Sequence, residues 1–183
     1  MATNFKTDAT RSQKQFSKFV EPALLAFGFT DIVSTESHDS ELARFLDYAG
    51  VDALARQKNG ATVTIASRII QIKPNGNDYN CFSIRDTRRN GQATELEKLQ
   101  HAIKRNSLRP YFHCQTFVDY EKEEAIVSLV RTAPLVQFVV DYPSFKDTCD
   151  GAKFRLAYWQ DLLLAGVNVS TLKIDANGKK IAA

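Results

Sequence analysis

Residues 51–72, VDALARQKNGATVTIASRIIQI, decide the fold prediction for this chain. They contain two strand-like runs, 51–57 and 62–72, on either side of a turn at Asn59 and Gly60. An Asn-Gly pair between such runs is a strong short-range hairpin signal, because tight hairpin turns need residues that tolerate positive φ angles. The stretch therefore predicts a β-hairpin.

The N-terminal side of this hairpin alternates between helical and strand-like patterns. Apolar residues at helical spacing predict an amphipathic helix at 10–28, which Pro22 kinks or restarts. A strand at 30–35 and a short helix at 41–50 are predicted to follow. The hairpin is thus preceded by a helix, a strand and a second, shorter helix.

The C-terminal side continues in the same manner. A turn-rich stretch at 73–80 precedes the strand-like run at 81–85, which predicts that the hairpin continues as a three-stranded antiparallel meander. Thr94 and Glu97 form a T-x-x-E capping box, so a helix is predicted at 94–106. We predict a second hairpin at 111–132, followed by two segments of helical spacing at 133–142 and 154–166. A last strand is predicted at 168–174, and 175–183 is predicted to be a frayed tail.

The composition is that of an ordinary globular protein. Hydrophobic residues make up 44% of the 183 residues and the net charge is +3, which predicts a single domain over 1–183. The odd number of cysteines, three, favours reduced thiols and a cytoplasmic location. With no apolar run near membrane-spanning length and no zinc-ligand spacing, we expect neither a membrane partner nor a zinc site.

Reduced to its elements, the chain over 10–120 resembles the α-β-β-β-α-β core of the restriction-endonuclease-like superfamily. The predicted fold class is therefore α/β (α+β) with a mixed central sheet, a helical elaboration at 121–174 and a tail at 175–183. In that superfamily an Asp on one hairpin strand and an E-x-K motif on the next hold a divalent metal, so the resemblance implies a metal-binding role for Asp52 after Gly50-Val51 and implies Mg²⁺ as a cofactor.

The expected E-x-K position reads Ala66-Ser67-Arg68. One carboxylate holds a hard cation weakly, so either the second acid has migrated or the nuclease chemistry is absent. Glu95 and Lys98 lie three apart on the predicted helix, on a face away from its apolar residues, and are candidates for a migrated acid and lysine. The predicted catalytic set is then Asp52, Glu95 and Lys98, with Asp52 and Glu95 as metal ligands and Glu41 as a weaker acid. Glu95 has the alternative role of stabilising the helix N-terminus.

Phosphate contacts are predicted for Arg68, Gln71, Arg85 and Arg88. Arg85 and Arg88 lie at a strand end and in its loop, where forked guanidinium groups can converge on a phosphate or simply remain solvated. Arg68 follows an apolar run and needs a partner if buried, with Asp52 and Glu95 as candidates. Polar and aromatic residues that could contact a base, or could belong to the core, are Gln71, Gln115, Tyr111, Phe112 and Phe117.

Three classes of function follow. The first is a nucleic-acid-binding, nuclease-like protein, either a metal-dependent or a degenerate phosphodiesterase. The second is a non-enzymatic phage or mobile-element protein that binds and inhibits a host protein machine on a degenerate nuclease scaffold, because the E-x-K motif is missing. Residues 82–98, FSIRDTRRNGQATELEK, resemble a run in uncharacterised phage and mobile-element proteins, which favours a site in this region without implying an activity. The third is a transferase or another small-ligand enzyme. No nucleophile pattern surrounds His113, so a catalytic triad is not predicted.

Overall fold

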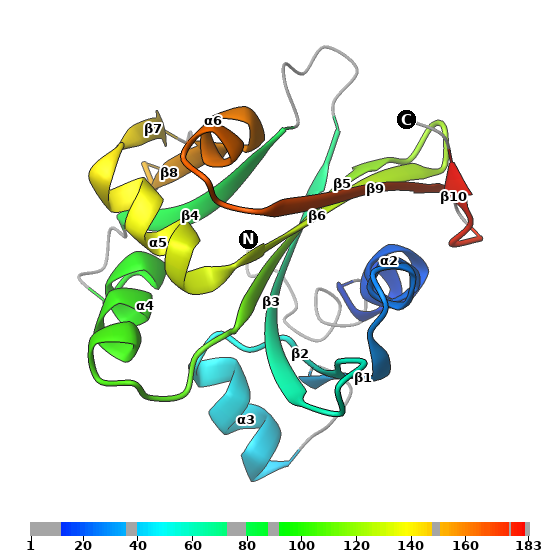
Figure 1. Ribbon diagram of the computed structural model, residues 1–183, viewed down its shortest axis with the longest axis horizontal. Helices are drawn as coiled ribbons and strands as arrows, with labels where there is room; N and C mark the ends of the chain where they lie inside the picture. Colours follow the sequence, from blue (N-terminus) through cyan, green and yellow to red (C-terminus); the bar gives the residue numbers. More distant parts are fainter. Residues whose placement is uncertain are drawn as a thin grey trace, which may run out of the picture.

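The computed structural model describes residues 12–35, 40–72, 80–87, 92–147, 151–175 and 177–181. Within these ranges the chain forms two β-sheets with helices packed around them (Figure 1). The larger sheet has seven strands in the order β1-β2-β3-β5-β6-β9-β10, and the smaller has the order β4-β8-β7. The predicted mixture of helices with a mixed sheet is confirmed.

The larger sheet is antiparallel except where β3 meets β5. Its strands are β1 (Thr30–Ser34), β2 (Ala53–Arg56), β3 (Thr62–Gln71), β5 (Phe112–Asp119), β6 (Glu124–Arg131), β9 (Val169–Asp175) and β10 (Lys180–Ile181). β2 and β3 form the predicted hairpin, with Gly60 at φ 83° in its turn. β5 and β6 form the second predicted hairpin. The parallel β3–β5 pair brings the two hairpins side by side.

The smaller sheet corrects one prediction. β4 (Cys81–Thr87) does not continue the hairpin as a meander but pairs with β8 (Lys153–Tyr158), which pairs with β7 (Ser144–Asp147). β4 carries Phe82 and Ile84 into a separate apolar cluster, and burial there decides its position. The described part of β4 thus lies in a different sheet from β3.

Two predictions about the C-terminal part were wrong. Residues 153–158 form β8, because pairing with β4 and β7 on both edges overrides the helical spacing of this segment. The helix is confined to α6 (Trp159–Leu164), and Gly166 follows it at φ 76°. Most of the predicted tail is also structured, since Lys180–Ile181 pair with β9.

The remaining helices frame these sheets. Residues 12–15 are helical and continue through the π-helical turn η1 (Phe16–Val20) into α2 (Glu21–Ala26), so the helical segment restarts next to Pro22 as predicted. The other helices are α3 (Glu41–Tyr48), α4 (Glu95–Lys104) and α5 (Thr132–Asp141). The predicted capping box at Thr94 and Glu97 is present at the start of α4.

Two apolar clusters lie on opposite sides of the larger sheet. On one side, buried residues of η1 and α2 such as Phe19 and Leu24 pack against Ile65 and Val127. On the other side, α4, α5, α6 and the smaller sheet form the second cluster (Figure 1). Because strand side chains alternate between faces, the polar residues of β3 and β5 that do not enter the first cluster face the second layer.

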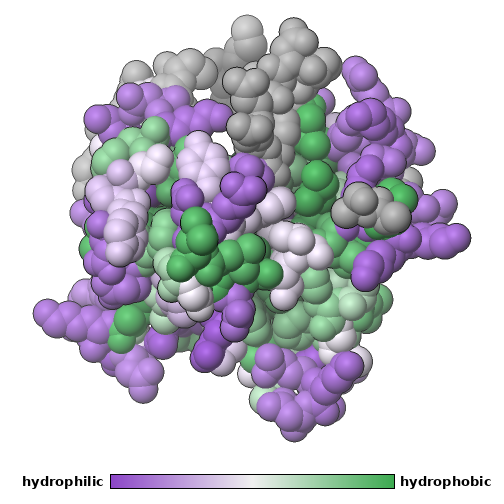
Figure 2. All heavy atoms as spheres, turned by 45° about the horizontal axis from the view of Figure 1, so that its top comes forward, coloured by the Kyte–Doolittle hydropathy of each residue, from purple (hydrophilic) through white to green (hydrophobic). Residues whose placement is uncertain are grey.

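Hydrophilic and hydrophobic side chains are unevenly distributed over one face of the molecule. Figure 2 shows hydrophilic side chains around its periphery and hydrophobic side chains gathered near its middle. Exposed apolar side chains of the chain include Leu163 and Leu164 on α6, which are 55% and 87% exposed. Apolar surface that stays exposed beside polar surroundings is typical of contact sites.

None of the helices in the described ranges is both long and apolar enough to cross a membrane.

Candidate functional site

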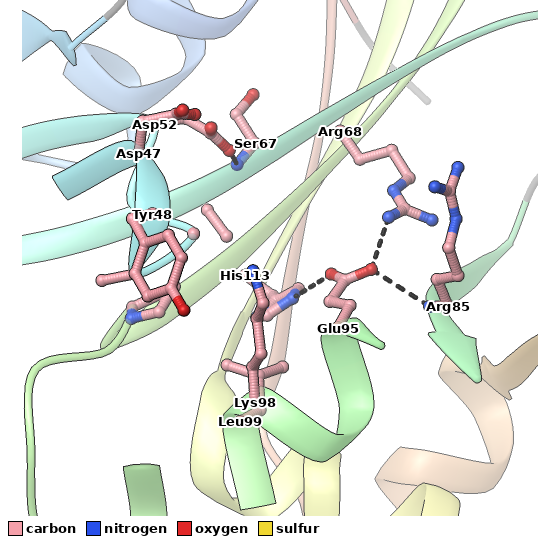
Figure 3. A pocket seen from close by; sticks show the side chains of 14 residues that line it. Asp47, Tyr48, Asp52, Ser67, Arg68, Arg85, Glu95, Lys98, Leu99 and His113 are labelled. Atoms are coloured by element: carbon pink, nitrogen blue, oxygen red, sulfur yellow. Dashed lines mark hydrogen bonds and ion pairs between the residues drawn. The ribbon is translucent and has the colours of Figure 1, made fainter. Parts of the chain in front are cut away.

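A cleft of about 260 Å³ opens where α3, the start of β2, β3 and the start of α4 come together (Figure 3). Its charged and polar lining comes from segments far apart in the sequence. These side chains are Asp47, Tyr48, Asp52, Ser67, Arg68, Arg85, Glu95, Lys98 and His113. The cleft therefore gathers three acids, three basic residues and one histidine.

Strand register brings the β3 and β5 residues of the cleft together. Ala66 lies opposite His113 and Arg68 lies opposite Gln115 in the parallel pair. Ile65 and Cys114, the neighbours of this row, enter the first apolar cluster, so Ala66, Arg68 and His113 project from the other face. A small residue at Ala66 leaves room in the cleft above the strand.

Glu95 is the centre of the polar network in the cleft. Its Oε2 accepts hydrogen bonds from the Arg68 guanidinium at 2.5 Å and from the Arg85 backbone amide at 3.0 Å. Its Oε1 lies 3.3 Å from Nε2 of His113. Both carboxylate oxygens are therefore engaged by donors from β3, β4 and β5.

The network keeps Glu95 ionised. Burial on its own would raise the pKa of this carboxyl, but the hydrogen bond with His113, the positive charge of Arg68 and the Arg85 amide outweigh burial. The resulting pKa is about 2, below the ordinary value of 4.5. Glu95 thus carries a negative charge throughout the neutral range.

The side-chain contacts of Glu95 and Gln115 also explain how β4 sits beside the larger sheet. The Ser83 amide donates to the Gln115 side chain at 3.3 Å, and the Arg85 amide donates to Glu95. These amides lie on the edge of β4 that faces away from β8. Side chains therefore satisfy backbone donors that a neighbouring strand would otherwise satisfy.

Two guanidinium groups lie over the same aromatic ring. The Cζ atoms of Arg68 and Arg85 are 5.0 Å and 5.3 Å from the centre of the Phe154 ring, on β8. Arg68 is paired with Glu95, whereas the buried Nε of Arg85 has no hydrogen-bond partner in the part of the chain that the structure describes. Arg85 therefore lines the cleft with its guanidinium held against the ring and its Nε buried.

Asp52 occupies the other part of the cleft, next to the hairpin. Its Oδ2 accepts a hydrogen bond from the Ser67 amide at 2.6 Å, and its own amide donates to the Ile65 carbonyl. Figure 3 shows Asp52 and Ser67 at the upper left, apart from the Glu95–Arg68 pair at the right. The two predicted metal ligands thus line one cleft but belong to separate hydrogen-bond groups.

This arrangement does not fit a magnesium site shared by Asp52 and Glu95. Such a site needs several free oxygen ligands, and both oxygens of Glu95 already accept hydrogen bonds. Across the described ranges, no group of three or more His, Cys, Asp or Glu side chains is placed to hold a metal ion. Binding of Mg²⁺ therefore stays a prediction.

Most of the predicted site residues converge. Five of them, Asp52, Arg68, Arg85, Glu95 and Lys98, line the cleft, and the partner of Arg68 is Glu95 rather than Asp52. The catalytic and metal-binding roles of these residues stay predictions.

Three other predicted residues do not line the cleft in the structure. Gln71 is exposed at the end of β3 and does not line it. Glu41 is exposed at the start of α3 and also lies outside the lining. Gln115 is buried against β4, and Arg88 lies outside the described residues.

Sequence reasoning missed His113 and Tyr48 as cleft residues. His113 carried a weak signal, since it alternates with Cys114 on an apolar strand. The signal for Tyr48 is its spacing of three residues from Phe45, which puts two aromatic rings on one face of α3. The aromatic residues predicted to contact a base do not line the cleft. Phe117 is buried, Phe112 packs against the first cluster and Tyr111 stacks on Arg131.

Comparison of the chain with protein-family models, with curated proteins and with solved structures found no match.

Proposed function

We propose that this chain is a nuclease-like protein that binds the sugar-phosphate backbone of a nucleic acid in the cleft between α3, β3 and α4. The observation that carries the proposal is the convergence of Arg68, Arg85 and Lys98 with Asp52 and Glu95 in one cleft. Convergence is what separates a site from charged residues that are scattered over a surface.

Two of the three basic groups in the cleft, Arg85 and Lys98, have no ion pair with Glu95, although Asp47 and Asp52 bring the formal charge of the lining to zero. Glu95 compensates Arg68 through a direct ion pair, so the attraction for a phosphate rests mainly on Arg85 and Lys98. Arg85 is held by the Phe154 ring, and its backbone amide is fixed by Glu95. A guanidinium group with a fixed orientation is suited to a phosphate oxygen pair, because its forked geometry matches two oxygens.

The element order supports the nuclease-like part of the proposal. The N-terminal helices, β1, β2, β3, α4 and β5 follow one another as α-β-β-β-α-β, with α3 and β4 added. Asp52 directly precedes β2, and Arg68 stands on β3 where the resembled superfamily has a lysine. Glu95 reaches the same cleft from α4, as a migrated acid would.

The proposal is tested by the binding of labelled single-stranded and duplex oligonucleotides at low salt, followed by fluorescence anisotropy. Arg85→Ala is expected to weaken binding about 10-fold, because a hydrogen bond to a charged group contributes about 1.5–3 kcal/mol. It should also lower the salt dependence by about one counterion. Arg105→Ala, at the exposed C-terminal end of α4, is the matched control and should bind as the wild type does. Absence of binding by the wild type overturns the proposal.

Catalysis is tested separately. The same oligonucleotides are incubated with Mg²⁺ or Mn²⁺, and products are resolved on a denaturing gel. Cleavage that disappears in Asp52→Ala, with the fold retained by circular dichroism, would support the predicted role of Asp52. Binding without cleavage would support the degenerate form of the nuclease-like site.

A second candidate function is binding to a protein, such as a host protein machine. The observation that favours it is the exposed apolar surface of α6, where Leu163 and Leu164 remain 55% and 87% exposed. The test is recovery of a stoichiometric partner from a host lysate by the wild type. Loss of that partner with Leu164→Lys and retention with Arg85→Ala would assign the function to this surface. Recovery of no such partner would count against it.

A further inference from the structure

α3 presents a row of large apolar side chains to solvent. Leu42, Phe45 and Tyr48 follow one another at a spacing of three residues and are 64%, 59% and 74% exposed. Residues at this spacing lie on one face of a helix. Ala43 and Leu46, on another face, are the buried residues of α3. The exposed row is therefore not the face by which the helix packs on the protein.

The row ends at the cleft. Tyr48 lines the cleft, and Nζ of Lys98 lies 4.7 Å from the centre of its ring. Figure 3 shows Tyr48 at the opposite end of the cleft from Arg68 and Arg85. The aromatic row of α3 is thus continuous with a surface that carries the positive charges of Lys98 and Arg85.

We infer that the cleft takes single-stranded nucleic acid, with unpaired bases stacked on Tyr48 and Phe45 while the backbone phosphates contact Lys98 and Arg85. The inference rests on the proposed function and names its substrate class. An aromatic ring on the side of a helix can stack only on a base whose face is free, and a duplex hides those faces in its stack.

The combination of aromatic rings and positive charges favours single-stranded nucleic acid as the ligand of the cleft. Grooves for single strands pair positive charge along the backbone with aromatic side chains for the bases, and both are present side by side here. Lys98 serves both parts, because its ammonium group sits over the Tyr48 ring and also lines the cleft. Tyr48 as a residue remains 74% exposed beside this contact, which leaves surface for a base.

The test compares three labelled probes of the same length, about 12 nucleotides, a length within known site sizes. They are an oligothymidylate, an abasic oligonucleotide with the same backbone, and a blunt duplex. We expect the wild type to bind the oligothymidylate at least about 5-fold more tightly than the other two, since stacking on one aromatic side chain is worth about that factor or more.

The variants separate stacking from charge. Tyr48→Ala should weaken oligothymidylate binding about 5- to 100-fold and leave abasic binding unchanged, and Phe45→Ala should act in the same direction. Tyr48→Phe keeps the ring and should retain wild-type affinity. Tyr142→Ala, which removes a 64% exposed tyrosine beyond the end of α5, is the matched control and should change nothing.

The outcomes distinguish the two proposals. If the wild type binds none of the probes, the proposed function fails. If it binds all three with equal affinity, or if Tyr48→Ala and Phe45→Ala leave oligothymidylate binding unchanged, only the inference of base stacking on α3 is overturned. In that case another kind of partner, such as a protein, covers the row.

Discussion

The carboxylate of Glu95 lies 2.5 Å from the guanidinium of Arg68, although 27 residues separate them in the chain. Their side chains are 25% and 29% exposed, so the ion pair is partly shielded from solvent. The pair joins α4 to β3, two elements that both line the cleft. It follows that one interaction serves both the stability of the fold and the shape of the site.

Removal of the Glu95 charge should destabilise the protein. Glu95→Gln leaves the Arg68 guanidinium partly buried without its counter-charge, and loss of one partner of a buried pair costs about 3–5 kcal/mol. Because this pair is partly exposed, we expect about 2–3 kcal/mol, measured as a lower midpoint of urea denaturation. Glu121→Gln, an exposed acid in the β5–β6 turn, is the control and should remain within about 0.5 kcal/mol of the wild type. Equal stability of the two variants would contradict a stabilising role for the pair.

The same carboxylate should make stability depend on pH in the acid range. The folded-state pKa of Glu95, about 2, lies below the ordinary value of 4.5. Its contribution is therefore fully present above about pH 4.5 and is lost as the pH falls toward 2. The contribution is at most about 3 kcal/mol, from 1.36 kcal/mol for each pH unit between the two pKa values.

The measurement is the free energy of unfolding of wild type and Glu95→Gln at several pH values. The difference between them should shrink as the pH falls from about 5 to about 3, because the wild type loses a contribution that the variant lacks. A difference that stays constant over this interval would show that Glu95 is not the group responsible.

The parts of the fold that the sequence predicts well are those with local causes. The hairpin at 51–72 depends on a turn at Asn59 and Gly60, and the start of α4 depends on a capping box three residues long. The position of β4 has no local cause. It depends on which apolar surface Phe82 and Ile84 can cover, and that surface is built by α4 and α5, later in the chain.

The residues of the cleft also differ in how far the sequence predicts their positions. That Arg68 has an acidic partner is predictable, because an arginine in an apolar strand needs an acid, but the sequence leaves Asp52 and Glu95 open and the structure selects Glu95. His113 is not, because its place in the cleft depends on the parallel register that sets it opposite Ala66. Gln115, a predicted candidate for contact with a base, is instead buried, and its side-chain oxygen accepts hydrogen bonds from the amide and hydroxyl of Ser83 on β4.

The bond between Gln115 and β4 should matter for stability. Gln115→Met keeps a similar volume but leaves the buried Ser83 amide and hydroxyl without the acceptor that they share. An unsatisfied buried donor costs about 1–3 kcal/mol, so we expect a loss in that range on urea denaturation. Gln137→Met, at an exposed position of α5, is the matched control. If both methionine variants are equally stable, Gln115 does not hold β4 in place.

Phe154 should control the orientation of the basic residues rather than their charge. Its ring underlies the guanidinium groups of both Arg68 and Arg85, so Phe154→Ala leaves the net charge unchanged while removing their common support. If the cleft binds nucleic acid as proposed, affinity should fall about 5- to 30-fold, in keeping with a cation–π contact worth about 0.5–1 kcal/mol for each of the two arginines.

The salt dependence of binding should distinguish orientation from charge in this variant. Phe154→Ala should retain the wild-type slope of affinity against salt, because all basic side chains remain, whereas Arg85→Ala should reduce the slope by about one counterion. Phe154→Leu fills the space without offering a ring face and should resemble Phe154→Ala. Wild-type affinity in Phe154→Leu would mean that apolar contact alone positions the two arginines, and that the ring face contributes nothing to binding.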